Sequence, residues 1–216
     1  GFGAVMHRRV KHKDEIIQRC EQWIVKDPLM QKGKWKEAFS NKGKLYLEIG
    51  SGKGQFITRL AMQNPSKNFI AVEGGDKIFV RILQKAEQMQ AKNLMLVTEY
   101  MSKLNPIFEQ GEIDGIYLNF SDPWPKERHA KRRLTHRDML KQYRIIAKEG
   151  ALLAFKTDNR KLFEFSVEEF SIAGLKTIAK TQDLHHSVYA TNNITTEYED
   201  KFVSRECPIF YILAEL

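Results

Sequence analysis

Several features are scarce or absent in this sequence of 216 residues. Its two cysteines, Cys20 and Cys207, lie far apart and exclude both a disulfide framework and a cysteine-rich zinc site. The six histidines show no paired spacing, so no metal is predicted. No apolar run approaches the roughly 18 residues of a membrane span, and residues 1–5 lack the apolar centre of a signal peptide. These absences favour a cytoplasmic protein that binds neither metal nor membrane.

Basic residues are in excess, with 35 Lys and Arg against 27 Asp and Glu and a formal net charge of +8. Such a balance favours a polyanionic partner, although a run of charge is more often a solvated face. The run here follows a predicted cleft segment, which favours contact with a phosphate backbone. Between residues 126 and 148 only Glu127 and Asp138 oppose Lys126, Arg128, Lys131, Arg132, Arg133, Arg137, Lys141, Arg144 and Lys148.

From Lys44 onward, short apolar segments alternate with helical patterns, which predicts an α/β fold with a mostly parallel sheet and helices on both faces. We divide the chain into a basic N-terminal arm and helical extension, residues 1–43, and an α/β domain with the predicted catalytic site, residues 44–216. Strands are expected at 45–49, 68–72, 94–97, 115–119, 151–156 and 209–213. Helices are expected at 14–25, 35–39, 54–63, 76–91 and 161–170.

Ligands of such sheets bind outside the carboxyl ends of the strands. The segments that follow the predicted strands are therefore the candidate binding loops. They are Glu48 to Gly54, Glu73, Glu99-Tyr100, Asn119 to Trp124 and Thr157-Asp158.

The first of these loops is rich in glycine, at positions 50, 52 and 54. The spacing is G-x-G-x-G, not the G-x-G-x-x-G of dinucleotide enzymes. Glu48 precedes the loop and is suited to accept from an ammonium group, while Glu73 ends the next strand and is suited to a ribose. This set predicts S-adenosylmethionine as cofactor. NAD would require hydride-transfer residues downstream, of which no plausible set is present, and a purely structural turn is the remaining alternative.

A second motif, Asn119-Phe-Ser-Asp-Pro-Trp-Pro125, follows the fourth predicted strand. It combines a carboxylate, a flat aromatic ring and two prolines that stiffen the loop. Trp124 is suited either to stack on a nucleobase or to pack and shape the loop. The basic run begins directly after this motif, so the excess charge lies beside the predicted cleft.

These segments carry a resemblance to a known family. Leu47 to Gly54, Ser121 to Lys126 with His129 to Thr135, Phe155 to Asn159, and Thr196 to Glu199 are similar to motifs of the bacterial tRNA (guanine-N7-)-methyltransferases. The resemblance runs from about Lys44 to the end of the chain. The glycine loop alone marks only the wider methyltransferase superfamily, whereas the Asp-Pro-Trp and Thr-x-Tyr-Glu segments are specific to this family.

The resemblance implies a Rossmann-like class I methyltransferase with a seven-stranded sheet and an antiparallel C-terminal strand. It implies methyl transfer from S-adenosylmethionine to N7 of a guanine in the variable loop of tRNA. A monomer and a homodimer both stay open. By matching position, the cofactor residues are Glu48, Gly50, Ser51, Gly52, Gly54, Glu73, Glu99, Tyr100 and Asp122, and either Glu99 or Tyr100 faces the adenine. The substrate residues are Lys126, Asp158, Thr196, Glu197, Tyr198 and Glu199, and the catalytic residues are Asp122 and Asp158.

Guanine N7 carries a lone pair and no proton at neutral pH, so its methylation requires alignment and no general base. We expect Asp122 or Asp158, with Glu197 or Glu199, to hold the donor edge of the base and balance the developing positive charge. Asp158 has an alternative role as the N-cap of the following helix.

Two other functions stay open. An exocyclic-amine methyltransferase usually has adjacent prolines in its second motif, but Pro123 and Pro125 are separated here. An inactive RNA-binding protein would have a degenerate glycine loop, but this loop is intact.

Overall fold

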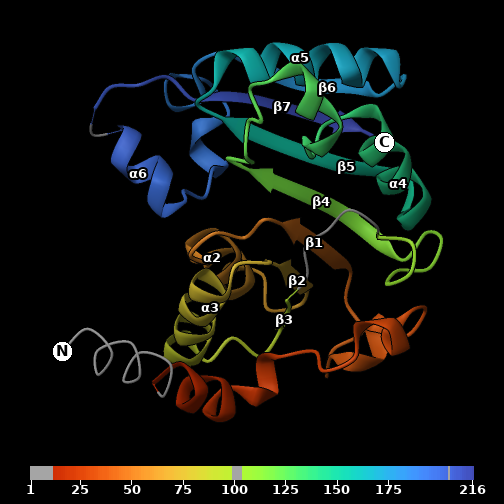
Figure 1. Ribbon diagram of the computed structural model, residues 1–216, viewed down its shortest axis with the longest axis vertical. Coiled ribbons are helices and arrows are strands. Elements are labelled where there is room, and N and C mark those ends of the chain that lie inside the picture. The colour runs from red at the N-terminus through yellow and green to blue at the C-terminus, as the bar shows by residue number, and fades with distance from the viewer. Residues whose placement is uncertain (1–11, 99–103, 204) are drawn as a thin grey trace.

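The computed structural model describes residues 12–98, 104–203 and 205–216. Its centre is one sheet of seven strands in the order β3-β2-β1-β4-β5-β7-β6 (Figure 1). All neighbouring strands from β3 to β5 are parallel, and β7 is antiparallel to both of its neighbours. The strands are β1 (Leu45–Ile49), β2 (Asn68–Val72), β3 (Leu94–Val97), β4 (Ile113–Asn119), β5 (Ala147–Thr157), β6 (Lys176–Thr181) and β7 (Phe210–Glu215).

Strand order reverses at β1, which pairs with β2 on one side and β4 on the other. The chain leaves β1 toward β2 and β3, and later returns to the opposite side to form β4 and β5. The connecting loops separate at such a point, which leaves a crevice at the carboxyl ends of β1 and β4. The fold therefore places the glycine loop after β1 beside the Asn119–Pro125 segment after β4.

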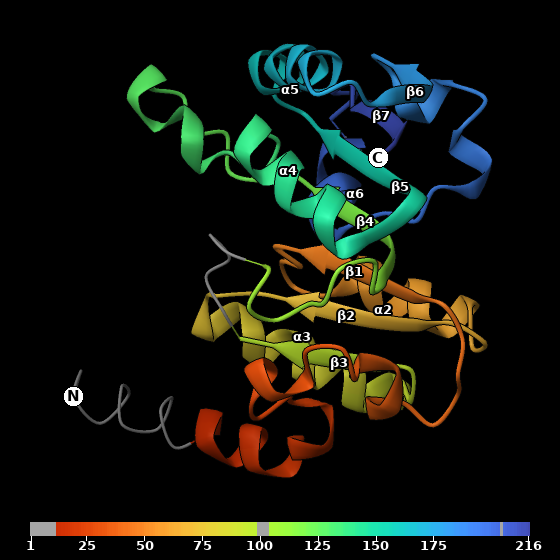
Figure 2. The same ribbon diagram turned by 90° about the vertical axis from the view of Figure 1, so that its right-hand side faces the viewer.

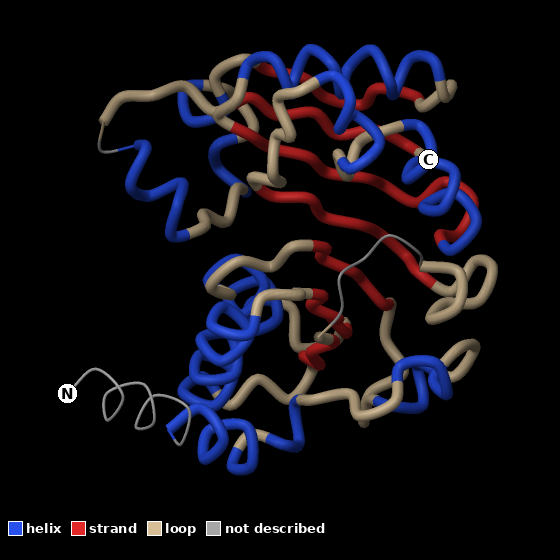
Figure 3. The backbone as a smooth tube through the Cα atoms, in the orientation of Figure 1, coloured by secondary structure: helices blue, strands red, loops and turns tan. Residues whose placement is uncertain are grey.

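Helices cover both faces of the sheet, so the strands form the inner layer (Figure 3). One face packs against α2 and α3, and the other packs against α4 and α5. The helices of the domain are α2 (Gln55–Gln63), α3 (Asp76–Met89), α4 (Arg137–Ile146), α5 (Arg160–Ile172) and α6 (Glu197–Val203).

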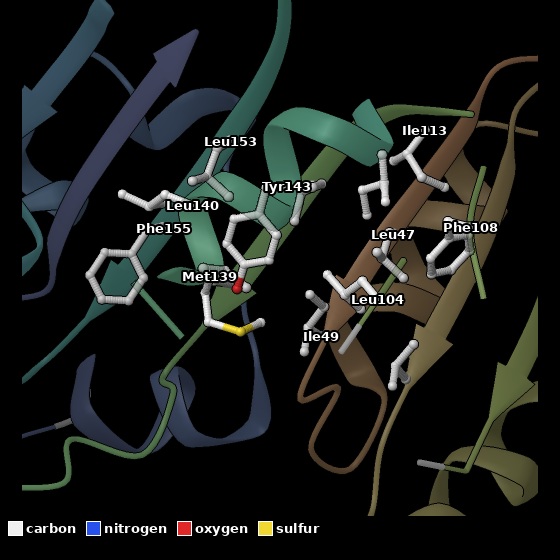
Figure 4. Packing of buried hydrophobic residues seen from close by; sticks show 14 of the residues in the cluster. Leu47, Ile49, Leu104, Phe108, Ile113, Met139, Leu140, Tyr143, Leu153 and Phe155 are labelled. Atoms are coloured by element: carbon white, nitrogen blue, oxygen red, sulfur yellow. The ribbon is translucent and has the colours of Figure 1, made fainter. Parts of the chain in front are cut away.

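Alternation along the strands divides the core between the two faces. Leu47 and Ile49 point to the face that also holds Tyr143 of α4 (Figure 4), whereas Phe69 and Ala71 point to the face of α2 and α3. Because β1, β2 and β3 are buried on both faces, their residues are apolar almost without interruption. For this reason, short continuous apolar segments of the sequence predicted these strands.

The predicted fold class is confirmed, and the expected strands and the helices at 54–63, 76–91 and 161–170 are present with small shifts of their ends. Among the α-helices and strands of the described residues, α4, β6 and α6 were not predicted. Strand β6 is an edge strand in which only Ala179 is buried, so its sequence lacks an apolar run.

The predicted helix at 14–25 is wrong in its second half. Residues 12–19 are helical, a 3-10 turn covers Glu21–Trp23, and Ile24 forms a parallel bridge with Leu96 of β3. The N-terminal segment leaves the helix because it pairs with the open edge of β3, as Figures 1 and 2 both show. An exposed strand edge is thereby covered. The short piece expected at 35–39 is a 3-10 helix, Trp35–Ala38.

The described part of the N-terminal segment packs onto the domain through two tryptophans. Trp23 Nε1 donates to the carbonyl of Ala91, and Trp35 Nε1 donates to the carbonyl of Ile107, both at 2.8 Å. Both rings are buried in the core of the domain. The division of the chain at residue 43 stays a prediction.

Neither cysteine forms a disulfide. In the described ranges, no helix combines the length and the apolar character needed to cross a membrane.

Candidate active site

The glycine loop after β1 requires glycine for its backbone. Gly50, Gly52 and Gly54 have φ angles of 73°, 54° and 90°, in the left-handed region that other residues adopt at a cost. At Gly54 a Cβ would also meet Ile82 of α3 at 3.0 Å. The loop is fixed to the neighbouring strand because the N–H of Gly50 donates to the carbonyl of Val72 at 2.8 Å. The glycine spacing thus reflects both conformation and close packing of α2 against α3.

Glu48 lies at the end of β1 and is buried. Asn119, at the end of β4, donates its Nδ2–H to Glu48 Oε2 at 2.7 Å. Glu48 Oε1 is buried and has no hydrogen-bond partner within the described residues. Burial raises the pKa of Glu48 to about 7, although the bond from Asn119 opposes the shift. The site therefore holds a carboxyl group with one oxygen ready for a donor or a cation.

Glu73 ends β2 and lies beside the glycine loop, as predicted. Its Oε2 accepts from the N–H of Gly52 at 3.0 Å, and its Oε1 accepts from the N–H of Gly75 at 3.2 Å. Burial raises the pKa of Glu73, and these backbone bonds oppose the shift. Gly75 has a φ of −82°, which any residue can adopt. The predicted cofactor residues Glu99 and Tyr100 lie outside the described residues.

The Asn119–Pro125 loop has an unusual backbone. Phe120 and Trp124 have φ angles of 53° and 44°, although neither is glycine. Non-glycine residues in this region are uncommon and cluster at functional sites. Asp122 is exposed, and the hydroxyl of Ser121 is buried without a hydrogen-bond partner in the described chain. Trp124 contacts the Arg132 guanidinium, at 4.9 Å from ring centroid to guanidinium carbon.

Asp158 follows β5 and accepts from the hydroxyl of Tyr198 at 3.1 Å. The alternative that Asp158 caps the next helix is wrong, because Asn159 is the N-cap of α5. Asn159 Oδ1 accepts from the N–H of Leu162 at 2.8 Å. The carboxylate of Asp158 is thus left for the cleft, where Tyr198 packs between the rings of Phe120 and Phe202.

The Thr196–Glu199 segment is the start of α6 and has the form of a capping box. The N–H of Glu199 donates to Thr196 Oγ1 at 2.9 Å, and the N–H of Thr196 points to Glu199 Oε1 at 3.4 Å. Glu197, the first residue of α6, contacts the residue that follows the glycine loop. Its Oε1 accepts from the N–H of Gln55, the first residue of α2, and its Oε2 is 3.0 Å from Lys85 Nζ.

Glu199 is fully buried and paired with Lys156, a residue whose role the sequence did not reveal. Lys156 Nζ also donates to the Asn193 side chain and to the carbonyl of Ile194, at 2.9 and 2.7 Å. His185 Nε2 lies 2.6 Å from Glu199 Oε2. Burial lowers the pKa of Lys156, and Glu199 opposes this shift. With both oxygens engaged inside the protein, Glu199 fits a role in holding this segment, and not the substrate contact that was expected.

These loops enclose a cleft of about 720 Å³ at the carboxyl ends of the parallel strands. Gly54, Lys126 and Glu199 do not line it. Asn119 and Ser121 were missed as site residues, although both lie in the second motif directly after a predicted strand. The predicted residues that the cleft brings together are Glu48, Gly50, Ser51, Gly52, Glu73, Asp122, Asp158, Thr196, Glu197 and Tyr198.

The basic run divides into exposed and internally paired side chains. Arg133 is buried, Arg137 pairs with Glu169 at 2.9 Å, and Lys148 pairs with Asp114 at 2.8 Å. Lys126, by contrast, is exposed beside the cleft, at the N-cap of the 3-10 helix Glu127–Arg132. The surface that faces solvent is therefore less positive than the sequence suggested. In the part of the chain that the structure describes, no cluster of His, Cys, Asp and Glu is arranged to hold a metal.

Two solved structures share this fold. A 16S rRNA methyltransferase, KamB, has a TM-score of 0.64 and 16% identity, over 85% of this chain and 93% of that one. A SAM-dependent methyltransferase from Aquifex aeolicus has a TM-score of 0.55 and 15% identity, over 94% and 97%. The sheet order, with its glycine loop at the switch point, is the class I fold of S-adenosylmethionine-dependent methyltransferases.

Sequence relatives narrow this class to a family. Residues 42–212 match the family model described as "Putative methyltransferase". A tRNA (guanine-N(7)-)-methyltransferase of Lachnoclostridium phytofermentans is 47% identical, over 96% of each chain. The protein of the same name from Bacillus subtilis is 42% identical, over 94% of this chain and 96% of its own. The chain belongs to the tRNA (guanine-N(7)-)-methyltransferase family.

Proposed function

We propose that this protein transfers a methyl group from S-adenosylmethionine to N7 of a guanine in the variable loop of tRNA. The family supports the reaction. The observation that carries it in this chain is the lining of the cleft, where Asp122, Asp158 and Glu197 come from three separate segments of a protein with a net charge of +8. Three carboxylates at one cleft of a basic protein suit a base that becomes positively charged.

The residues of the cleft fit the cofactor. Glu48 Oε1 and Ser121 Oγ are buried, line the cleft and have no hydrogen-bond partner in the described residues. A buried polar atom without a partner is costly, so each favours a ligand that supplies one. Glu48 suits the ammonium of the methionine moiety, and Glu73 suits the ribose hydroxyls. When bound, S-adenosylmethionine supplies a methyl group activated on a sulfonium.

The remaining side chains act on the base. Because N7 has no proton to lose, no residue of the cleft has to act as a base toward it. We infer that Asp158 and Asp122 accept from the N1 and N2 donors of guanine, which would orient its N7 edge toward the cofactor. Their charge stabilises the positive charge that the ring gains. Glu197 reaches the same cleft from α6, whereas Glu199 stays inside the protein.

The test is incubation of unmodified tRNA transcript with the protein and labelled cofactor. We expect one labelled guanine in the variable loop, detected by chemical cleavage at 7-methylguanine. Nuclease digestion with mass spectrometry would show a different methylated atom if the product were an exocyclic amine. Failure to bind S-adenosylmethionine in calorimetry would instead support an RNA-binding protein with no activity.

A further inference from the structure

Arg133 belongs to the basic run in sequence, but its side chain lies inside the protein, 7% exposed. Its guanidinium donates three hydrogen bonds to the Asn119–Pro125 loop. Arg133 Nε is 3.0 Å from the carbonyl oxygen of Pro123 and 3.1 Å from that of Trp124, and Nη2 is 2.8 Å from the latter. The guanidinium carbon also lies 4.4 Å from the centroid of the Phe165 ring. Arg133 therefore contacts two consecutive backbone groups next to Asp122.

This cation has no ionic partner, because no carboxylate of the residues that the structure describes pairs with it. A buried charge that has lost its water must be compensated by oriented dipoles or by a ring face. Among the described residues, the carbonyls of Pro123 and Trp124 and the ring of Phe165 supply this compensation. The orientation of those carbonyls and the burial of Arg133 therefore depend on each other.

The loop itself needs such support. Phe120 and Trp124, at its two ends, both have positive φ angles, which persist only where surrounding contacts impose them. At the first end, the N–H of Phe120 donates to the carbonyl of Lys156 in β5 at 2.9 Å. At the second end, Trp124 is held by Arg133. Asp122 lies between these two anchors, so its position is fixed only while both are in place.

Arg133 is itself held on a rigid base. Its N–H donates to the carbonyl of Ala130, and the following carbonyl, of Leu134, accepts from the buried hydroxyl of Tyr143 in α4 at 2.6 Å. Thr135 Oγ1 then shares a hydrogen bond of 2.7 Å with Ser166 of α5. The segment around Arg133 thus connects the loop after β4 to both helices on this face of the sheet.

We propose that Arg133 is a positioning residue that holds the Asn119–Pro125 loop in the conformation that presents Asp122 and Trp124 to the cleft. It does not contact RNA phosphates. This inference rests on the proposed function, because its activity readout is methylation of tRNA. A lysine cannot replace it, since one ammonium lacks the planar fork that reaches two carbonyls at fixed angles.

The test compares Arg133→Met and Arg133→Lys with Lys131→Met, an exposed residue of the preceding 3-10 helix. Turnover and KM for tRNA are measured over a range of salt concentrations, and thermal unfolding shows that each variant folds. We expect kcat to fall about 100-fold in Arg133→Met, the effect of a displaced catalytic group, with an unchanged salt slope. Arg133→Lys should stay well below the wild type. Lys131→Met should instead raise KM and lower the slope.

A second readout does not depend on activity. Trp23 and Trp35 are buried, whereas Trp124 is partly exposed in the cleft, so quenching of tryptophan fluorescence by acrylamide reports on the loop. We expect quenching to increase in both Arg133 variants and not in Lys131→Met. Unchanged quenching and kcat, with a lowered salt slope, would overturn the proposal in favour of a phosphate contact. If the proposed function is wrong, the wild type will not methylate tRNA. Acrylamide quenching would still show whether Arg133 holds the Asn119–Pro125 loop.

Discussion

Lys156 and Glu199 form an ion pair inside the protein, with 2.6 Å between Lys156 Nζ and Glu199 Oε1. Their side chains are 3% and 0% exposed. The pair joins the end of β5 to the first turn of α6, and Lys156 also holds the carbonyl of Ile194. The Thr196–Tyr198 side of the cleft is therefore attached to the sheet through one buried cation.

This arrangement predicts a large effect on stability. Lys156→Met removes the lysine partner of the buried Glu199 and leaves His185 and Asn193 beside its carboxylate, so we expect the free energy of unfolding to fall by about 3–5 kcal/mol. The double variant Lys156→Met/Glu199→Met should be destabilised by clearly less than the sum of the two single variants. Urea denaturation of all four proteins measures this coupling. Additive effects would show that the pair contributes no mutual stabilisation.

Glu48 predicts a pH dependence. Burial raises the pKa of Glu48 from 4.5 to about 7. The neutral carboxyl therefore contributes its full stabilisation to the folded state below pH 4.5, and this stabilisation is lost as pH rises through about 7. Without cofactor, we expect this group to lower the free energy of unfolding by about 3 kcal/mol across that window. Glu48→Gln stays neutral and should show a flatter profile. Identical pH profiles for wild type and variant would contradict the raised pKa.

Asp158 predicts a separation of catalysis from cofactor binding. Asp158→Ala removes the proposed partner of the guanine edge, and we expect turnover on tRNA to fall at least ~100-fold. The affinity for S-adenosylmethionine, measured by calorimetry, should stay close to that of the wild type. Tyr198→Phe is the matched control, because it removes only the hydrogen bond to Asp158 and should have the smaller effect. If Asp158→Ala methylated tRNA as fast as the wild type, Asp158 would not be a partner of the guanine edge.

Lys126 predicts a change in salt dependence. It is exposed beside the cleft, so Lys126→Ala should weaken tRNA binding and lower the slope of log K against log salt by about one. Lys148→Ala is the control from the same basic run, since Lys148 is already paired with Asp114. We expect its slope to match the wild type. The same slope in all three proteins would argue against a phosphate contact at Lys126.

Much of the cleft was predictable because a local pattern sufficed. Glycines at alternate positions after an apolar strand predicted the loop, and acids at the ends of successive strands predicted Glu48, Glu73 and Asp122 as neighbours. In a parallel sheet the carboxyl ends of the strands share one edge, so order in sequence becomes proximity in space. Strand β6 was not predicted because it lies at the edge of the sheet and buries only Ala179, so its sequence has no apolar run.

The sequence by itself determined the fold class, the glycine loop and which loops meet at the cleft. Only the tertiary structure decided which charged side chains face inward. Asn119 contacts Glu48, 71 positions away in sequence, and Lys156 of β5 pairs with Glu199 of α6. The side chain of Arg133 points to the carbonyl of Trp124 and not to solvent. Burial and partner, which fix the energy and the role of a charge, arise from segments that are distant in the chain, and no local pattern contains them.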